Sequence, residues 1–514
     1  MLGCIPDKPQ KVSMMAGNKI VDIMNILLDT NILIPIFDIE HPLDERFAKM
    51  QRLLDRLSFH VFVHPAQRDD FERDSNVERK KRNLSRLPQH NVLESPPIPS
   101  EEELQKLSWT QTTDNDRVDN LLLYALKTQA VHVLVSDDSR VLSKAKRSGL
   151  QDRVYRLDQF LFFLESRLSP TFTVPIGIED KFLYELKHPE ADFWNSLRQS
   201  YNGFDNWFVE KAREHRKAWC ICNTQGYPLA VCIYKEEDSP VVTDDNIRLP
   251  GKVLKLCTFK VAKELQGRKL GERLLFTAFR YAVEHKIAYV YLHTRAQDQL
   301  IDLCEDFGFT NQGKYNTDEV WAKQMIPPNG MQRFDQSPLE FAKYYYPHFV
   351  DDERVNKFII PIRPQYHNEL FPDISDDAYS LFAKEFVPNS PQSNTIKKAY
   401  LCWANTNQIK AGDILLFYRT DDRRSIEIIG IVEHTCKTND IAETLALVSK
   451  RTVFSNDKLQ DILQKETLII LFRFAKIIPA ISYKKFSNAG IKGNIQSIRL
   501  ISHDSYLQLV SSNE

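Results

Sequence analysis

Carboxylates recur at the ends of apolar, strand-like segments in the first 160 residues of the chain. Asp29 follows the run NILL, Asp69 and Asp70 follow HVFVHP, and Asp137 and Asp138 follow VHVLV. The carboxyl ends of strands in an open parallel sheet face one crevice, which collects ligands. Carboxylates gathered there repel one another unless a cation lies between them, and hard oxygen ligands suit Mg²⁺ or Mn²⁺. A water bound to such a metal is a nucleophile for phosphodiester hydrolysis.

A further acidic cluster opens a segment with helical spacing. It contains Asp114, Asp116 and Asp119, and the last two share one helical face because they are three residues apart. Each acid also has a purely structural explanation. Asp-Thr-Asn after a strand is a helix cap, and single acids at strand ends are common surface residues.

The joint order of these acids, with LLDTN, DNDRVDNLLL and VLVSDD as its motifs, resembles that of PIN-domain nucleases over residues 20–165. The resemblance implies a parallel α/β sheet that cleaves RNA with Mg²⁺ or Mn²⁺. Asn31 would then orient Asp29, and Ser136 lies where the family often has serine or threonine. The family usually has glutamate as its second acid, whereas this chain has aspartate. The implied catalytic residues are Asp29, Asp70 (or Asp69), Asp116, Asp119 and Asp138, with Asp29, Asp119 and Asp138 as metal ligands.

A basic stretch follows the second strand of this region. It includes Arg79, Lys80, Lys81 and Arg82. Such a stretch can hold the phosphate backbone of a nucleic acid against an acidic cleft. It can equally be a solvated helix face, since Asp74 and Glu78 lie beside it.

A second kind of site is indicated by the strand VLKLCTFKV, which runs into a loop with Gly267 and Gly271 and then into a long amphipathic helix. Glycine lets the backbone approach an anion, and free amides at a helix N-terminus bind phosphate. With the later segments AYVYLHT and LIDLCEDFGF, the order resembles that of GNAT acyltransferases over residues 170–326. The resemblance implies that the loop holds the pyrophosphate of acetyl-CoA and that two central strands splay apart to admit the pantetheine. The implied cofactor-binding residues are Val261, Gln266, Gly267, Arg268, Lys269, Leu270 and Gly271.

The chain departs from the GNAT pattern at two positions. Lys269 replaces the middle glycine of the loop, where it either adds a phosphate contact or obstructs the cradle. Cys304 stands where many members have a tyrosine as general acid, and a thiol with a pKa of about 8.5 can protonate a departing CoA thiolate. A cysteine packed in a helix is the structural alternative. Glu264 and Asp306 are near in sequence, but neither is assigned as the base.

The C-terminal segments FIIPIRPQYHNELFPD, KKAYLCWANTNQIKAGDILLFYR and SIEIIGIVEHT resemble the ASCH/EVE branch of PUA-like barrels. Phe417 and Tyr418 should point to opposite faces of their strand. Related barrels hold RNA or modified bases in a cleft by stacking and base-edge hydrogen bonds. The alternative is that these aromatic residues form the core and that Arg363 and His367 are simple loop residues. The candidate cleft residues are Lys398, Tyr400, Trp403, Asn405, Tyr418 and Arg419.

These motifs need three sets of elements to position them. Strands and helices alternate over residues 21–160, which predicts a parallel α/β sheet. A hairpin with its turn near Gln225 and Gly226 opens the second region, which is α+β, and short strands dominate the third, which predicts a small β-barrel. The predicted fold is therefore multidomain. The predicted domains are 20–165 (PIN-like), 170–326 (GNAT-like) and 355–510 (ASCH/EVE, PUA-like).

Composition limits the function classes. The chain has 514 residues, with 68 Lys and Arg against 69 Asp and Glu, which excludes a wholly basic nucleic-acid coat. No apolar run approaches the roughly 18 residues that span a bilayer, and the first 20 residues lack a secretory signal. The cysteines include no CxxC, which argues against a disulfide framework or a structural zinc site. We therefore expect a reduced, cytoplasmic protein that does not enter membranes.

Together the resemblances favour a Mg²⁺- or Mn²⁺-dependent ribonuclease fused to an acetyl-CoA-dependent N-acetyltransferase and a nucleic-acid reader. Such a chain would act on RNA (tRNA among the candidates) or modified nucleic acid, as a toxin or defence effector. Pairing with a second copy and binding of an antitoxin or regulatory partner are open. One alternative is acetyl transfer as the main activity. Another is a nucleic-acid-binding regulator whose PIN and GNAT regions are catalytically silent scaffolds.

Overall fold

The computed structural model of the chain divides into two compact units. The first unit takes in residues 1–170, 438–450 and 454–466, and the second takes in 171–437, 451–453 and 467–514. Within the described residues, no helix combines the length and the apolar character needed to cross a bilayer. The structure describes residues 24–38, 44–57, 59–168, 178–186, 192–223, 225–265, 269–295, 299–327, 337–371, 396–448, 451–452 and 456–511.

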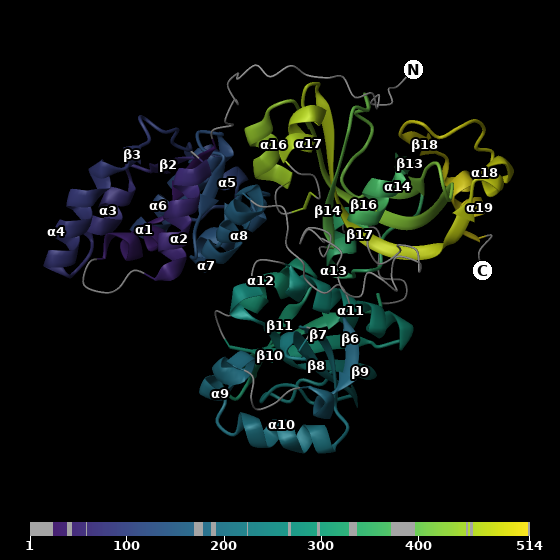
Figure 1. Cartoon of the computed structure of the whole chain (residues 1–514), viewed down its shortest axis with the longest axis horizontal. Coiled ribbons are helices and arrows are strands. Elements are labelled where there is room, and N and C mark those ends of the chain that lie inside the picture. The colour runs from purple at the N-terminus through teal and green to yellow at the C-terminus, as the bar shows by residue number, and fades with distance from the viewer. Residues whose placement is uncertain are drawn as a thin grey trace. The chain divides into compact units, whose positions relative to one another are not determined.

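Parallel strands form the sheet of the first unit, in the order β3-β2-β1-β4-β5. This arrangement confirms the predicted parallel α/β sheet. Figure 1 labels β2 and β3 among the helices of this unit. The order reverses between β1 and β4, and ligands of open parallel sheets bind at the carboxyl ends of the strands at such a switch point. The strands are β1 (Asn25–Leu28), β2 (His60–Val63), β3 (Asn91–Val92), β4 (Val133–Val135) and β5 (Val154–Tyr155).

The first helix of this unit begins directly after β1. The segment TNILIPIF is helix α1 (Thr30–Phe37), because the Asp29 side chain caps it and Ile32, Leu33 and Phe37 are buried. The next helices are α2 (Glu45–Leu57), α3 (Gln67–Glu72), α4 (Val77–Arg86), α5 (Glu101–Lys106), α6 (Asp114–Lys127), α7 (Ser139–Arg147) and α8 (Leu157–Leu168).

Two helices join the first unit from far along the chain. They are α16 (Ile441–Val448) and α17 (Asn456–Ile462), and they lie in the part of the sequence that was predicted to be mostly β. Glu443 of α16 accepts a hydrogen bond from Nε2 of Gln129 at 3.3 Å. The interruption of a β region by helices that belong to another unit was not predicted.

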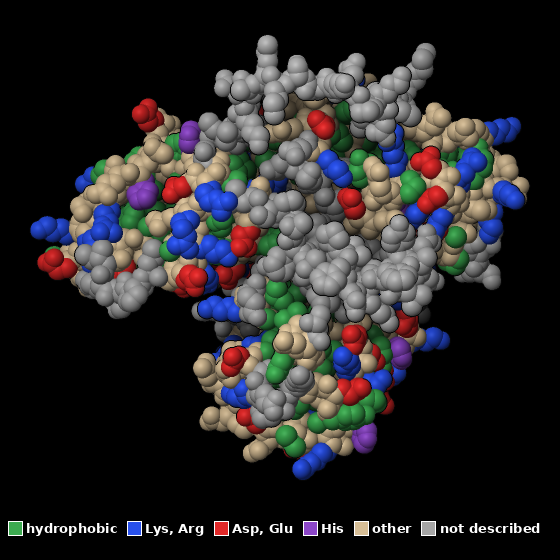
Figure 2. Space-filling view, viewed as in Figure 1, with side chains coloured by type: hydrophobic (Ala, Val, Ile, Leu, Met, Phe, Trp, Pro, Cys, Tyr) green, Lys and Arg blue, Asp and Glu red, His purple; other side chains and the backbone are tan. Residues whose placement is uncertain are grey.

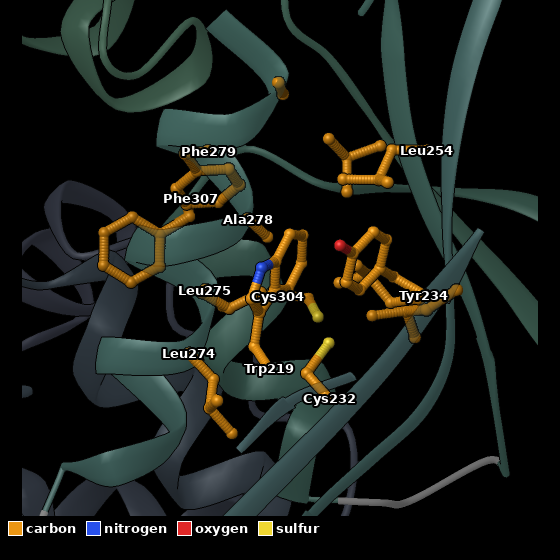
Figure 3. Packing of buried hydrophobic residues seen from close by; sticks show 14 of the residues in the cluster. Trp219, Cys232, Tyr234, Leu254, Leu274, Leu275, Ala278, Phe279, Cys304 and Phe307 are labelled. Atoms are coloured by element: carbon orange, nitrogen blue, oxygen red, sulfur yellow. The ribbon is translucent and has the colours of Figure 1, made fainter. Parts of the chain in front are cut away.

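A seven-stranded sheet begins the second unit, in the order β11-β12-β10-β9-β8-β7-β6. Helices α11 and α12 pack on one of its faces through an apolar cluster that includes Trp219, Leu254, Leu274 and Phe279 (Figure 3). A second cluster places Phe204 and Phe208 of α10 on the other face. The elements are β6 (Glu179–Phe182), α9 (Asn195–Ser200), α10 (Phe204–Arg213), β7 (Lys217–Cys222), β8 (Pro228–Asp238), β9 (Lys252–Val261), α11 (Leu270–Glu284), β10 (Tyr289–Thr294), α12 (Gln299–Asp306), β11 (Thr310–Tyr315) and β12 (Asp318–Gln324).

The centre of this sheet is split. β9 and β10 pair in parallel only from Val253 to Leu256 of β9, whereas β9 continues to Val261. The pairing of β8 with β9 shifts register at this place, because Tyr234 lies opposite Leu256 and Ile233 lies opposite Thr258. Cys257 is therefore the extra residue of a β-bulge, which bends the strand. The two strands separate beyond the bulge, as the resemblance implied.

A six-stranded sheet completes the second unit, in the order β14-β17-β16-β15-β13-β18. Phe417 and Tyr418 belong to apolar clusters on opposite faces of β15, as predicted. Closure of this sheet into a barrel stays a prediction. The elements are α13 (Pro338–Tyr344), β13 (Lys357–Ile362), α14 (Pro364–Leu370), β14 (Lys397–Cys402), β15 (Ile414–Arg419), β16 (Ser425–Thr438), β17 (Thr467–Ser482), α18 (Lys484–Asn488), β18 (Arg499–Ile501) and α19 (His503–Ser511).

Buried charges join the two sheets of the second unit. Lys397 Nζ of β14 lies 2.7 Å from a carboxylate oxygen of Asp306, at the end of α12. Arg473 of β17 donates a hydrogen bond to the Asp306 carbonyl at 3.1 Å and also binds Glu433 at 3.0 Å. Arg451 binds the other Glu433 oxygen at 2.5 Å. Burial raises the pKa of Glu433, but the surrounding cations outweigh it and hold that pKa well below its usual range.

Gly308, which follows α12, packs closely against Tyr344 at the end of α13, and this contact can be tested. Its φ is +79°, and a Cβ there would lie 2.4 Å from the Tyr344 carbonyl oxygen. We expect Gly308→Ala to lower the free energy of unfolding by about 2–4 kcal/mol, through left-handed backbone strain and steric overlap. Gly203→Ala, with φ +81° and open space around it, should cost only about 1 kcal/mol. Urea denaturation followed by tryptophan fluorescence measures both, and equal losses would contradict the close approach.

Candidate functional site

The switch point of the first unit is held by one hydrogen-bonded group. Asp29, directly after β1, is 5% exposed and accepts hydrogen bonds from Asn31 Nδ2 at 2.7 Å and Ser136 Oγ at 2.6 Å. Its other oxygen accepts from the Thr30 amide at 2.6 Å. Because Ser136 follows β4, these bonds join the ends of the two central strands. Asn31 orients Asp29 as the resemblance implied.

Of the two candidates for the second acid, Asp70 is the one that bonds to a neighbour of Asp29. Asp70 accepts a hydrogen bond from Oγ1 of Thr30, the residue after Asp29, at 2.7 Å, and burial raises the pKa of its carboxyl. Asp69 points elsewhere and pairs with Arg117. Since α3 carries both residues, only the hydrogen bond to Thr30 distinguishes the acid that lies near Asp29.

A lysine side chain lies within ion-pair distance of Asp116 and Asp119, two acids of α6. Lys144 of α7 is 3% exposed, and its Nζ lies 3.0 Å from Asp116 and 3.5 Å from Asp119. The hydrogen bond from Lys144 holds the pKa of Asp116 well below its usual range. Burial raises the pKa of Asp119 to about 6 against the charge of Lys144. Asp116 also caps its own helix with Thr113.

The charges of Asp119 and Asp138 act on the buried carboxylate of Asp29. Burial raises the pKa of Asp29 to about 7, and the nearby charges of Asp119 and Asp138 add to the rise. Burial acts in the same direction on Asp138, but Arg140 binds it at 3.0 Å and keeps its pKa below the ordinary value.

Two features of this site bear on whether it could hold a metal ion: the grouping of its acidic side chains and the charge of Lys144. Within the described chain, no three His, Cys, Asp or Glu side chains are grouped closely enough to hold a metal ion. The ammonium of Lys144 balances part of the negative charge there. The described residues therefore do not form the three-carboxylate site of Asp29, Asp119 and Asp138 that the resemblance implied.

The predicted basic surface on α4 carries acids among its cations. Arg79 pairs with Asp74, and Arg82 lies 3.7 Å from Asp38. Lys80 donates to the Glu72 carbonyl, while Lys81 is exposed. Figure 2 shows basic and acidic side chains next to each other at the α4 end of the first unit. This mixture favours the solvated helix face over a dedicated phosphate track.

In the second unit, the residue that replaces the family's glycine keeps a glycine-like backbone. Lys269 directly precedes α11 with φ +61° and ψ +16°, a left-handed conformation that glycine adopts without strain. Gly271 is also closely packed, because a Cβ there would lie 3.4 Å from both Phe259 and Leu303. Lys269 thus has the backbone conformation that a glycine could take at the start of α11. Gln266, Gly267 and Arg268 lie outside the described residues.

The first turn of α11 holds a buried carboxylate. Glu272 is 3% exposed and accepts hydrogen bonds from the amides of Ile396 at 2.6 Å and Lys397 at 3.1 Å. Lys269 Nζ is 3.7 Å from the other oxygen. These donors neutralise an acid at the helix end that would otherwise repel a pyrophosphate.

The predicted acid–base residues of this region have structural roles. Cys304 is 0% exposed and lies in the apolar core with Trp219 and Cys232 (Figure 3), which fits a packing cysteine and not a general acid. Asp306 is held by Lys397, and the side chain of Glu264 lies outside the described residues. Val261 and Leu270 flank the loop at the end of β9 and the start of α11.

A set of polar residues on the other face of the sheet was missed. His293 of β10 is half-buried, one residue beyond the last residue of β10 that pairs with β9, and its Nε2 has no hydrogen-bond partner. Burial, followed by the charge of Lys255, lowers the pKa of His293 to about 4, so the imidazole is neutral at pH 7. Tyr291 donates to Glu237 at 2.5 Å, and Lys255 Nζ lies 5.3 Å from the Tyr291 ring centre.

A signal for this set was present in the sequence. In AYVYLHT the residues Tyr289, Tyr291 and His293 alternate with Val290 and Leu292. Alternation of period two puts the aromatic and polar residues on one face of the strand. Val290 and Leu292 indeed join the cluster with α11, whereas Tyr291 packs on the opposite side.

The candidate cleft residues of the third region are largely tied into the fold. Tyr400 donates to the Pro361 carbonyl at 2.7 Å, and Tyr418 packs in a core cluster with Phe486. Arg419 is 3% exposed and binds Asn368 at 2.7 Å. Lys398 is also buried, Trp403 is half-buried, and Asn405 is exposed. These contacts favour the core role for Tyr400 and Tyr418.

Arg363 and His367, both considered as loop residues, have different environments in the structure. His367 is 0% exposed, neither ring nitrogen has a hydrogen-bond partner, and burial lowers its pKa to about 3. Arg363, which precedes α14, is exposed. Only Arg363 fits the simple loop residue considered for both.

Comparison with protein families gives a match for one region of the chain. Residues 181–309 match the model of the acetyltransferase (GNAT) family, which confirms the predicted GNAT region. No curated protein matches the chain. The resemblance of the first unit to PIN-domain nucleases stays a prediction.

Three solved structures show partial similarity. A mutant ASCH protein from Zymomonas mobilis is 12% identical, with 32% of this chain and 100% of that chain covered and a TM-score of 0.25. A putative acyl-CoA N-acyltransferase from Klebsiella pneumoniae subsp. pneumoniae MGH 78578 is 14% identical, with 29% and 97% covered and a TM-score of 0.21. The PaiA N-acetyltransferase from Thermoplasma acidophilum, in complex with coenzyme A, is 12% identical, with 29% and 99% covered and a TM-score of 0.20.

The raised pKa of Asp29 predicts a pH-dependent stability of the first unit without divalent cations. Between pH 4 and pH 7 the folded state binds more protons than the unfolded state, so stability falls as pH rises. For a pKa raised from 3.8 to about 7, the loss is at most about 4 kcal/mol. Hydrogen exchange of β1 and β4, corrected for the intrinsic rate, measures it. Asp29→Asn should flatten the dependence, and an equally steep dependence in that variant would contradict it.

Proposed function

We propose that the second unit is an acetyl-CoA-dependent N-acetyltransferase. The observation that carries the proposal is that β9 and β10 separate after Leu256 within a region that matches the GNAT family. One face beside the gap is filled by the apolar core under α11 and α12. The other face has half-buried polar residues, among them His293 and Lys255, and the proposal places the amine on this side.

The chemistry needs a neutral amine. Its nitrogen forms a bond to the thioester carbon, the carbon–sulfur bond breaks, and CoA leaves with that electron pair. The amine must also lose a proton, and we assign its first acceptor as Nε2 of His293, which is neutral and without a partner. The amides at the start of α11, with Lys269, would hold the pyrophosphate.

His293 can be tested directly. We expect His293→Gln to lower kcat for acetyl transfer about 100-fold, because a general base contributes at least that factor, while KM for acetyl-CoA stays unchanged. Transfer of the ¹⁴C-acetyl group from acetyl-CoA to a panel of amino acids and peptides measures the rate. The matched control is His285→Gln, an exposed histidine just after α11.

Two results would count against the proposal. Full kcat in the His293→Gln variant would remove this residue from the chemistry. Failure of saturating acetyl-CoA to raise the melting temperature would reject the acetyltransferase itself, because a ligand of the native state at 100 times its Kd adds about 2.7 kcal/mol.

RNA cleavage by the first unit is a second candidate function. It is favoured by the meeting of Asp29, Asp70, Asp119 and Asp138 around the switch point, where parallel sheets bind ligands. Because the described residues form no three-ligand metal group, we route no step through Mg²⁺ or Mn²⁺. RNA, including tRNA, would then be a shared partner of this unit and the ASCH-like region.

This candidate is tested with labelled single-stranded RNA and total tRNA, with and without Mn²⁺. Asp29→Asn keeps the shape and removes the charge, so cleavage should fall at least 100-fold. The control is Asp69→Asn. Asp69 lies on the same helix as Asp70 but pairs with Arg117, so this change should alter the cleavage rate less than twofold. No cleavage of either RNA under any condition, or an equal loss in both variants, would be the contrary result.

A further inference from the structure

The open face of the GNAT region contains one ammonium group whose charge is not balanced. Lys255 is half-buried in the middle of β9, and no carboxylate lies within ion-pair distance of its Nζ among the residues that the structure describes. The Nζ atom of Lys255 lies 5.3 Å from the centre of the Tyr291 ring. A buried ammonium without a carboxylate is costly unless an anion joins it.

The other charged groups on this face already have partners. Lys235 pairs with Glu237, which also accepts the Tyr291 hydroxyl. Arg216 binds Glu214 at 3.1 Å and contacts the Cys257 sulfur at 3.6 Å. With His293 neutral, the face has a surplus of positive charge centred on Lys255. The lowered pKa of Lys255, caused first by burial, agrees with this surplus.

We propose that the acetyl acceptor is an amine that also has a carboxylate or phosphate, and that Lys255 binds this anionic group. The inference rests on the proposed acetyltransferase function. Lys255 lies opposite Tyr291 in the parallel pairing, and His293 is two residues further along β10. Since a strand rises about 3.3 Å per residue, the anion and the amine of the acceptor are about 7 Å apart.

Matched acceptors test the inference on the full chain. Glycylglycine is compared with glycylglycine amide, and O-phosphoethanolamine with ethanolamine, with ¹⁴C-acetyl transfer from acetyl-CoA as the readout. We expect kcat/KM to be at least 10-fold higher for the anionic member of one or both pairs. The two pairs distinguish a carboxylate from a phosphate as the preferred anion.

Variants then assign the preference to one side chain. Lys255→Gln should remove it by raising KM for the anionic acceptor, and Lys255→Arg should restore it. Lys252→Gln is the matched control, because this exposed lysine of the same strand pairs with Glu236 at 2.8 Å. It should leave the preference unchanged.

The outcomes separate the two proposals. If acetyl-CoA does not stabilise the protein, the acetyltransferase function fails. If acetyl-CoA binds and the neutral amines are used as well as the anionic ones, or none of the four is acetylated, the inference about the acceptor is wrong. The comparison of acceptors needs no variant, so it decides the question even if Lys255→Gln does not fold.

Discussion

The early end of the pairing between β9 and β10 is the constraint on which the second unit depends. Four residues of β9 pair in parallel with β10, and the bulge at Cys257 then turns the strand away. Because hydrogen bonds no longer join the two strands, a gap remains in the middle of the sheet.

Charge compensation explains which residues are structural and which are available for chemistry. Buried charges with several partners, such as Glu433 with its two arginines and Glu272 with two backbone amides, fasten elements together. Among the described residues whose burial costs are only partly offset, three lie at the candidate sites. Asp29 and Asp119 have raised pKa values at the switch point of the first unit, and Lys255 lies beside the gap in the second.

Local patterns in the sequence were sufficient for the elements and for the acids of the first unit. An apolar strand followed by Asp-Thr-Asn predicts the position of Asp29, and Asn31 and Ser136 meet it because β1 and β4 are neighbours. Packing across elements was not predictable in this way. Cys304 and Tyr418 have residue types that suit chemistry or stacking, and only the core around them shows that they are buried. Lys144 is one of many lysines until α6 and α7 are placed side by side.

The bonds from β14 to Glu272 and Asp306 have a consequence for any shorter version of this chain. In a chain cut after residue 326, Asp306 would lose its ion pair with Lys397, and Glu272 would lose the two amides that donate to it. The region that matches the GNAT family is therefore held in part by residues that lie outside the match.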